Sequence, residues 1–241
     1  MSQDELPAGG EQLPLGIELS VESRLEDFFQ GDNVAAVSAS RAMAAGEMTG
    51  CLFLAGPPAS GKTHLLQGSC HHAHALKRQA AYLPLRQPAL RSPDLLAGWE
   101  SFELVCIDDL ETVAGLRDWE RALFRLFEGL KEQGGGLLVT AAALPGGLGL
   151  ALPDLASRLA SGPVYQLASL DDEDRVRALK KRLAQRGLAL PDDSARWLMR
   201  RARRDMHTLM DLADRLDRLS LSAQRRLTIP FLREVLPEAS D

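Results

Sequence analysis

The sequence is poor in cysteine and in aromatic residues, and it has no long apolar run. Its 3 cysteines, Cys51, Cys70 and Cys106, lie far apart among apolar residues and show no metal-ligand spacing. We interpret them as buried, reduced thiols of a cytoplasmic protein. No segment approaches the about 20 apolar residues that a membrane span needs, and the acidic segment Met1–Glu11 lacks the apolar core of a signal peptide. These absences exclude secreted, membrane-embedded and disulfide-scaffold classes.

Positive charge is not in excess either. The chain has 28 Lys and Arg residues against 33 Asp and Glu, which gives a net charge of −5. A protein that coats nucleic acid needs excess positive charge along a groove or face, so this class is disfavoured. The charge is also unevenly divided, with 12 basic and 20 acidic residues in 1–170 but 16 and 13 in 171–241. This asymmetry indicates two parts with different surfaces.

Short apolar runs alternate with longer amphipathic segments through most of the chain. Four of these runs, bounded by turn residues, are predicted to be buried strands: Cys51–Ala55, Ala80–Leu85, Leu104–Ile107 and Leu137–Thr140. Strands of this kind, separated by helix-length segments, form a parallel sheet with crossover helices. The sequence therefore predicts an α/β fold.

The pattern changes near Leu170, after which no strand-like run occurs. Helices are predicted at about 171–185, 192–203, 206–219 and 229–236, with Asp171 and Asp174 as an N-terminal cap pair and Gly187 closing the first. We therefore predict a flexible tail at 1–21, an α/β domain at 22–169 and a small all-helical domain at 170–241.

A phosphate-binding loop follows the first predicted strand. The segment Gly56–Thr63 fits G-x-x-x-x-G-K-[ST] and leads into a helix, the context that this motif requires. Its backbone N–H groups and the helix dipole, about half a positive charge, favour a phosphate chain there. Lys62 would reach the β- and γ-phosphates, and the Thr63 hydroxyl would hold Mg²⁺. The sequence therefore predicts nucleotide binding.

Polar residues end two of the other predicted strands. Asp108 follows Leu104–Ile107 and would hold the Mg²⁺ through water, and Asp109 could orient or deprotonate an attacking water. Thr140 could direct its hydroxyl at a γ-phosphate, although a threonine at a strand end is also a common structural feature. Arg158 is either a solvated charge or an arginine finger that enters the nucleotide site of a neighbouring subunit.

Together these features resemble an AAA+ module: a P-loop domain with a central parallel sheet, followed by a helical lid. The segment 28–33 (FFQGDN) resembles the start of DnaA-type AAA+ domains, and 152–159 (LPDLASRL) resembles their arginine-finger segment. From about Gln12 to Leu236 the chain resembles the Hda family of DnaA-related proteins, with 170–174 and 224–231 especially similar. The resemblance covers nearly the whole chain.

The resemblance implies a function. Members of this family bind a nucleotide, dock on the DNA-loaded sliding clamp (the β subunit of DNA polymerase III) and stimulate ATP hydrolysis by the initiator DnaA, which prevents a second initiation. Arg158 would be the finger that acts in trans. His207 stands where related proteins carry a nucleotide-sensing arginine of the lid, so sensing through the lid is an open question. Phe28 would lie beside the base.

The expected contacts fall into two sets. The nucleotide contacts, for ADP or ATP, are Gly56, Pro57, Ser60, Gly61, Lys62, Thr63, His64, Phe28 and His207. The clamp contacts are Gln12, Leu13, Leu15 and Ile17. Ile17 would supply an apolar contact that Gly16, which stands where Phe or Pro is more usual, cannot make. Direct sequence-specific DNA binding is not expected, and a homo-oligomer is possible.

Two other functions fit parts of the same pattern. An autonomous ATPase of the helicase-loader or transposition-helper type would use the same nucleotide motifs and hydrolyse ATP alone or with single-stranded DNA. A DNA-binding initiator fragment would use the arginine-rich segment 200–204, and its affinity would fall steeply with salt. Slow hydrolysis of its own ATP by this chain is compatible with the regulatory function, whereas the autonomous ATPase predicts substantial turnover.

Overall fold

The computed structural model describes residues 19, 23–87, 92–201, 206–223 and 226–236. Five parallel strands form one sheet in the order β2-β3-β4-β1-β5. The strands are β1 (Gly50–Ala55), β2 (Ala80–Pro84), β3 (Leu104–Asp108), β4 (Gly136–Ala141) and β5 (Val164–Gln166). The four predicted strands and the parallel α/β fold are confirmed, and β5 was missed.

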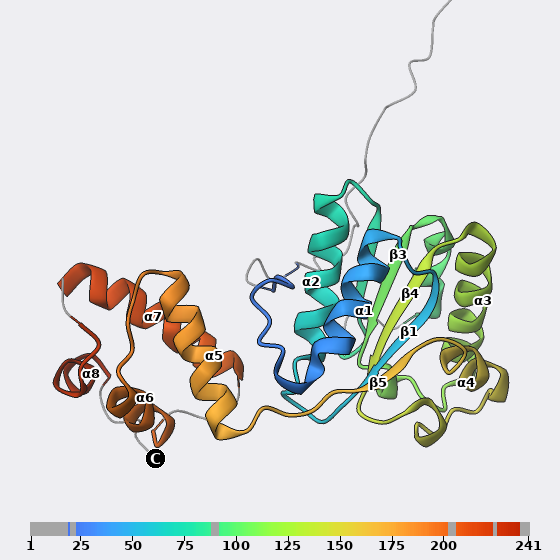
Figure 1. Ribbon diagram of the computed structural model, residues 1–241. Helices are drawn as coiled ribbons and strands as arrows, with labels where there is room; N and C mark the ends of the chain where they lie inside the picture. Colours follow the sequence, from blue (N-terminus) through green and yellow to red (C-terminus); the bar gives the residue numbers. More distant parts are fainter. Residues whose placement is uncertain (1–18, 20–22, 88–91, 202–205, 224–225, 237–241) are drawn as a thin grey trace, which may run out of the picture.

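Helices cover both faces of this sheet, with α1 and α2 on one face and α3 and α4 on the other (Figure 1). Alternation along β1 explains this, because Cys51, Phe53 and Ala55 pack toward α3 and α4 while Leu52 and Leu54 pack toward α1 and α2. The helices are α1 (Val34–Ala45), α2 (Lys62–Ala75), α3 (Arg117–Gln133) and α4 (Pro153–Leu159). All three cysteines are buried and free, as predicted.

Short 3₁₀ turns connect these elements at several points. They are η1 (Gly31–Asn33), η2 (Pro93–Leu96), η3 (Trp99–Ser101), η4 (Leu110–Thr112) and η5 (Pro145–Gly147). The turn η4 begins directly after Asp109 and so holds the residues that follow β3 close to the sheet edge.

Four helices after β5 form a separate layer with its own apolar core, which we refer to as the lid (Figure 1). They are α5 (Asp172–Gln185), α6 (Asp192–Met199), α7 (Met206–Ala223) and α8 (Ile229–Val235). The predicted cap is present, because the Asp171 carboxylate accepts a hydrogen bond from the backbone N–H of Asp174 at 2.7 Å. The predicted helix at 192–203 is shorter, since Arg200 caps α6.

Within the described residues, the helices are too short or too polar to span a bilayer. The lid contacts the α/β domain through α5, which lies beside the segment 23–30 that precedes η1. The carboxyl ends of the strands, where ligands of open parallel sheets bind, therefore lie close to the lid.

Candidate functional site

The phosphate loop connects β1 to α2, as predicted, and two of its residues have left-handed backbone conformations. Gly61, directly before α2, has φ +90°, and Ala59 has φ +62°. A Cβ atom on Gly61 would lie 2.5 Å from Cε2 of Phe28. Glycine is therefore required at position 61 both by the backbone and by the aromatic ring packed against it.

Lys62 folds back over the loop that precedes it. Its Nζ donates hydrogen bonds to the carbonyl oxygens of Gly56 at 2.7 Å and Pro57 at 2.8 Å. Burial lowers the pKa of Lys62, because it disfavours the charged form, while Glu111, Asp109 and Asp108 oppose this shift. An anion in the loop would offer this ammonium group a stronger partner than two neutral carbonyls.

Two other loop side chains fit a phosphate and a metal ion. The Ser60 hydroxyl is buried and has no hydrogen-bond partner among the described residues. An orphaned buried hydroxyl is costly, and a phosphate oxygen would satisfy it. Thr63 is exposed at the first turn of α2, where its hydroxyl can reach a cation beside the phosphates. The loop thus fits a nucleotide phosphate chain.

Side chains from three neighbouring strands meet at the end of β3. Asp108 is buried, and its Oδ2 accepts a hydrogen bond from the Tyr82 hydroxyl of β2 at 2.9 Å. Its Oδ1 accepts one from the Thr140 hydroxyl of β4. Thr140 Oγ1 in turn accepts from the backbone N–H of Asp109 at 3.1 Å. Both carboxylate oxygens of Asp108 are therefore engaged, which suits a contact to Mg²⁺ through water.

Asp109 occupies a left-handed backbone position, φ +59°, beside the cavity. Its carboxylate pairs with Arg86, with 3.2 Å between Asp109 Oδ2 and Arg86 Nε, and Arg86 Nη2 lies 3.5 Å from Glu111 Oε1. Burial and the neighbouring Asp108 raise the pKa of Asp109, and Arg86 partly offsets this. Arg86 is thus a cation at the acidic edge that the sequence analysis did not identify.

Phe28 and His64 lie together on the other side of the loop. Their ring centroids are 5.5 Å apart, and His64 Nε2 lies 2.8 Å from the carbonyl oxygen of Arg24. Burial lowers the pKa of His64, so the neutral ring with a proton on Nε2 donates to that carbonyl. The structure therefore places both predicted residues against the loop, where they can form one wall of a base site.

These parts enclose one cavity of about 550 Å³ between the α/β domain and the lid. Its walls include the predicted residues Phe28, Ser60, Gly61, Lys62, Thr63, His64 and Asp109. The lid contributes residues that the sequence analysis missed: Ala178, Lys181, Arg182, Gln185 and Met210. Arg86 lies two residues after β2, so its position in the sequence could have placed it at the carboxyl ends of the strands. No motif marks the lid residues.

Arg158 lies elsewhere. It belongs to α4, which packs on α3, and it is not among the residues that line the cavity. Its Nε lies 2.8 Å from Oε1 of Glu128, and its side chain is 41% exposed. The structure thus separates Arg158 from the nucleotide cavity of its own chain.

For some predicted residues, the structure does not describe the side chain. Gln12, Leu13, Leu15 and Ile17 lie in 1–18, outside the described residues. The backbone of His207 lies in α7, but its side chain is not described. The clamp motif and the lid sensor position therefore stay predictions.

Two sequence comparisons relate this chain to known proteins. The sequence model of the family described as "Hda, lid domain" matches residues 172–236. An uncharacterized protein of Haemophilus influenzae is 41% identical over 226 residues, which cover 93% of this chain and 98% of that protein.

Solved structures share the fold. Domain III of the Thermotoga maritima replication initiation protein DnaA has a TM-score of 0.71 at 19% identity, covering 91% of this chain and 98% of that one. AMPPCP-bound DnaA from Aquifex aeolicus has a TM-score of 0.69 at 22% identity, covering 82% and 67%.

Proposed function

This chain belongs to the Hda family of DnaA-related AAA+ proteins, and we propose that it is a negative regulator of DNA replication initiation. In this proposal it binds ADP or ATP with Mg²⁺, docks on the DNA-loaded sliding clamp in the cytoplasm, and stimulates ATP hydrolysis by DnaA. Arg158 enters the ATP site of DnaA in trans. The partner, rather than this chain, then carries out the rate-determining hydrolysis.

The observation that carries the proposal is the place of Arg158. An arginine that is partly exposed on α4 and lies away from its own chain's nucleotide cavity is placed to act on the site of another molecule rather than on its own. A finger of this kind stabilises charge on the transferring phosphoryl group and contributes about 10³–10⁵ in rate. Nothing in the cavity of this chain needs Arg158, and this supports an action in trans.

The cavity itself supports a bound nucleotide. The Ser60 hydroxyl without a partner, the Lys62 ammonium on two carbonyls and the exposed Thr63 hydroxyl all fit a phosphate chain with its cation. The AMPPCP bound to the Aquifex aeolicus DnaA is consistent with this. Bound nucleotide would hold the lid against the α/β domain and so stabilise the form that meets DnaA.

The test is the conversion of ATP to ADP on DnaA, measured with this protein in the presence and absence of DNA-loaded clamp. We expect clamp-dependent stimulation that is lost in Arg158→Ala and in Gln12→Ala, while both variants keep the wild-type melting temperature and ADP affinity. Full stimulation by Arg158→Ala would refute the action in trans. Full stimulation by Gln12→Ala would refute the docking role of the tail.

A second function has one specific observation in its favour. The loop with Lys62 and the acidic edge with Asp108 and Asp109 carry the residue types that ATP hydrolysis uses, which favours hydrolysis by this chain itself. An autonomous ATPase would turn over ATP alone or with single-stranded DNA, and Lys62→Ala would abolish that turnover. Substantial turnover without any stimulation of DnaA would favour this function over the regulatory one.

A further inference from the structure

Three side chains of α3 at four-residue spacing are directed to α4 and the loop before it: Glu120, Phe124 and Glu128. Glu120 is fully buried, and its carboxylate accepts hydrogen bonds from the backbone N–H groups of Gly115, Ala151 and Leu152 at 2.7, 3.0 and 2.7 Å. The last two residues directly precede α4. This contact fixes the start of the helix that carries Arg158.

The other two side chains hold Arg158 itself. Glu128 Oε1 lies 2.8 Å from Arg158 Nε, and the guanidinium carbon lies 6.0 Å from the centroid of the Phe124 ring. A ring at this distance attracts the cation, and the carboxylate adds an attraction between opposite charges. Arg158 is thus held from two sides against α3 while its outer part stays accessible.

We propose that Glu128 is a positioning residue for Arg158, an inference that rests on the proposed role of Arg158 in the partner's site. The contact with Glu128 uses Nε, whereas the two terminal nitrogens carry the four N–H groups that can face phosphate oxygens. Because the guanidinium is oriented before docking, the complex forms with the finger already in place. Loss of that orientation is expected to lower the stimulated rate about tenfold, since small displacements of a catalytic group cost this much or more.

An opposite role would give an opposite sign. If the negative charge of Glu128 merely competed with the partner's phosphates for Arg158, removing it would free the finger and raise the rate. If Glu128 contacted the partner directly, its loss would raise the concentration of this chain needed for half-maximal stimulation. The positioning role instead predicts a lower maximal rate at an unchanged half-maximal concentration.

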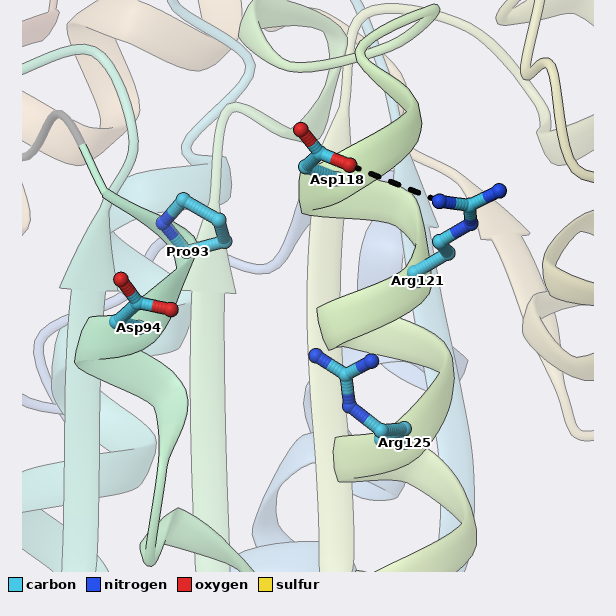
Figure 2. Close-up of a pocket in the computed structure, with 5 residues that line it drawn as sticks. All are labelled: Pro93, Asp94, Asp118, Arg121 and Arg125. Carbon is cyan, nitrogen blue, oxygen red and sulfur yellow. Dashed lines mark ion pairs between the residues drawn. The ribbon is translucent and has the colours of Figure 1, made fainter.

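The control for charge removal is Asp118 on the same helix. Asp118 is paired with Arg121, with 3.8 Å between Oδ1 and Nη1, and both residues line a surface pocket with Pro93, Asp94 and Arg125 (Figure 2). This pocket faces η2 rather than α4. Asp118→Asn therefore removes one exposed negative charge of α3, and its ion pair with Arg121, without changing the contacts of Arg158.

The experiment measures ATP hydrolysis by DnaA against the concentration of the full chain, with DNA-loaded clamp. We expect about tenfold lower maximal rate for Glu128→Ala, an intermediate rate for Glu128→Gln because it keeps a polar side chain of the same shape beside Arg158 but loses the charge, and the wild-type curve for Asp118→Asn. Melting temperatures identify any variant that fails to fold. If Glu128→Ala fails to fold, Glu128→Gln still tests the positioning role.

The outcomes separate the two proposals. If Arg158→Ala loses stimulation but the Glu128 variants match the wild type, stimulate faster, or change only the half-maximal concentration, the positioning role is overturned and the proposed function stands. If Arg158→Ala stimulates fully, both proposals fail.

Discussion

Asp27 and Arg182 form an ion pair between the α/β domain and the lid, with 3.4 Å between Asp27 Oδ2 and Arg182 Nη1. Both side chains are largely buried, and both line the nucleotide cavity. Arg182 Nε also lies 3.6 Å from Oδ1 of Asp214, which pairs with Arg186 Nη2 at 2.6 Å. A chain of charges therefore runs from the segment before η1 into the core of the lid.

Breaking this pair should loosen the lid over the cavity. We expect Asp27→Asn to weaken ADP binding about fivefold, because a pair of this kind contributes about 1 kcal/mol. Calorimetric titration with ADP measures the affinity, and hydrogen exchange measures the protection of α5. Asp217→Asn is the control, since Asp217 pairs with Arg186 at 3.2 Å wholly within the lid. Equal ADP affinities for the two variants would show that Asp27 does not couple the lid to the site.

Gly61→Ala should abolish or strongly weaken nucleotide binding. The new Cβ would meet the Phe28 ring at 2.5 Å in a backbone with φ +90°, so both the loop and the aromatic wall must move. We expect more than about a tenfold loss of ADP affinity, since loop N–H groups displaced by this much lose their hydrogen bonds. Gly98→Ala is matched to it, because Gly98 has φ +84° with open space around it. That variant should lose stability but keep its affinity, and an equal affinity loss in both would contradict the steric argument.

Glu120→Gln should destabilise the α/β domain. In the wild type, the Glu120 carboxylate accepts hydrogen bonds from backbone N–H groups. The substitution places an amide NH₂ group opposite some of these N–H groups, and this leaves buried donors without a partner. The expected cost is about 2 kcal/mol, or about 4–8 °C in melting temperature. Thermal unfolding followed by circular dichroism measures it. The exposed Glu132→Gln on the same helix should change the unfolding free energy by less than about 0.5 kcal/mol, and similar losses in both variants would refute this role of Glu120.

The buried His64 makes stability depend on pH. Burial lowers the pKa of His64 in the folded chain, helped by Arg182 and opposed by the Arg24 carbonyl and Asp27. The unfolded chain binds a proton at a higher pH, about 6.5, so the free energy of unfolding should fall as the pH drops below that value. His64→Gln should flatten this decline, as measured by urea unfolding at pH 7.5 and pH 5.5. Identical pH slopes for the two proteins would contradict the prediction.

Local motifs in the sequence sufficed for much of the fold and part of the site. The run before Gly56 and the glycines of the loop specify a strand, a turn and a helix within fourteen consecutive positions, so β1 and the start of α2 followed directly. The cap at Asp171 is local in the same way. By contrast, β5 is only three residues long and partly exposed, and it is a strand only because it pairs with β1.

The rest of the site depends on strand order, which the sequence does not display. Tyr82 and Thr140 meet at Asp108 because β2 and β4 flank β3. The sequence analysis considered a Thr140 hydroxyl aimed at a phosphate, whereas the structure bonds it to Asp108 and to the Asp109 N–H. Arg182 reaches the cavity only because α5 packs over the segment before η1.

The two hydroxyls that donate to Asp108 also influence how this carboxylate would bind a divalent ion. Because each oxygen of its carboxylate already accepts a hydrogen bond, from Tyr82 or from Thr140, Asp108 has less capacity left for a lone divalent ion than a free carboxylate has. The ion becomes attractive only when phosphate oxygens arrive with it and complete its coordination shell. In the proposed function, this arrangement therefore favours magnesium that arrives already chelated by a nucleotide over the free ion.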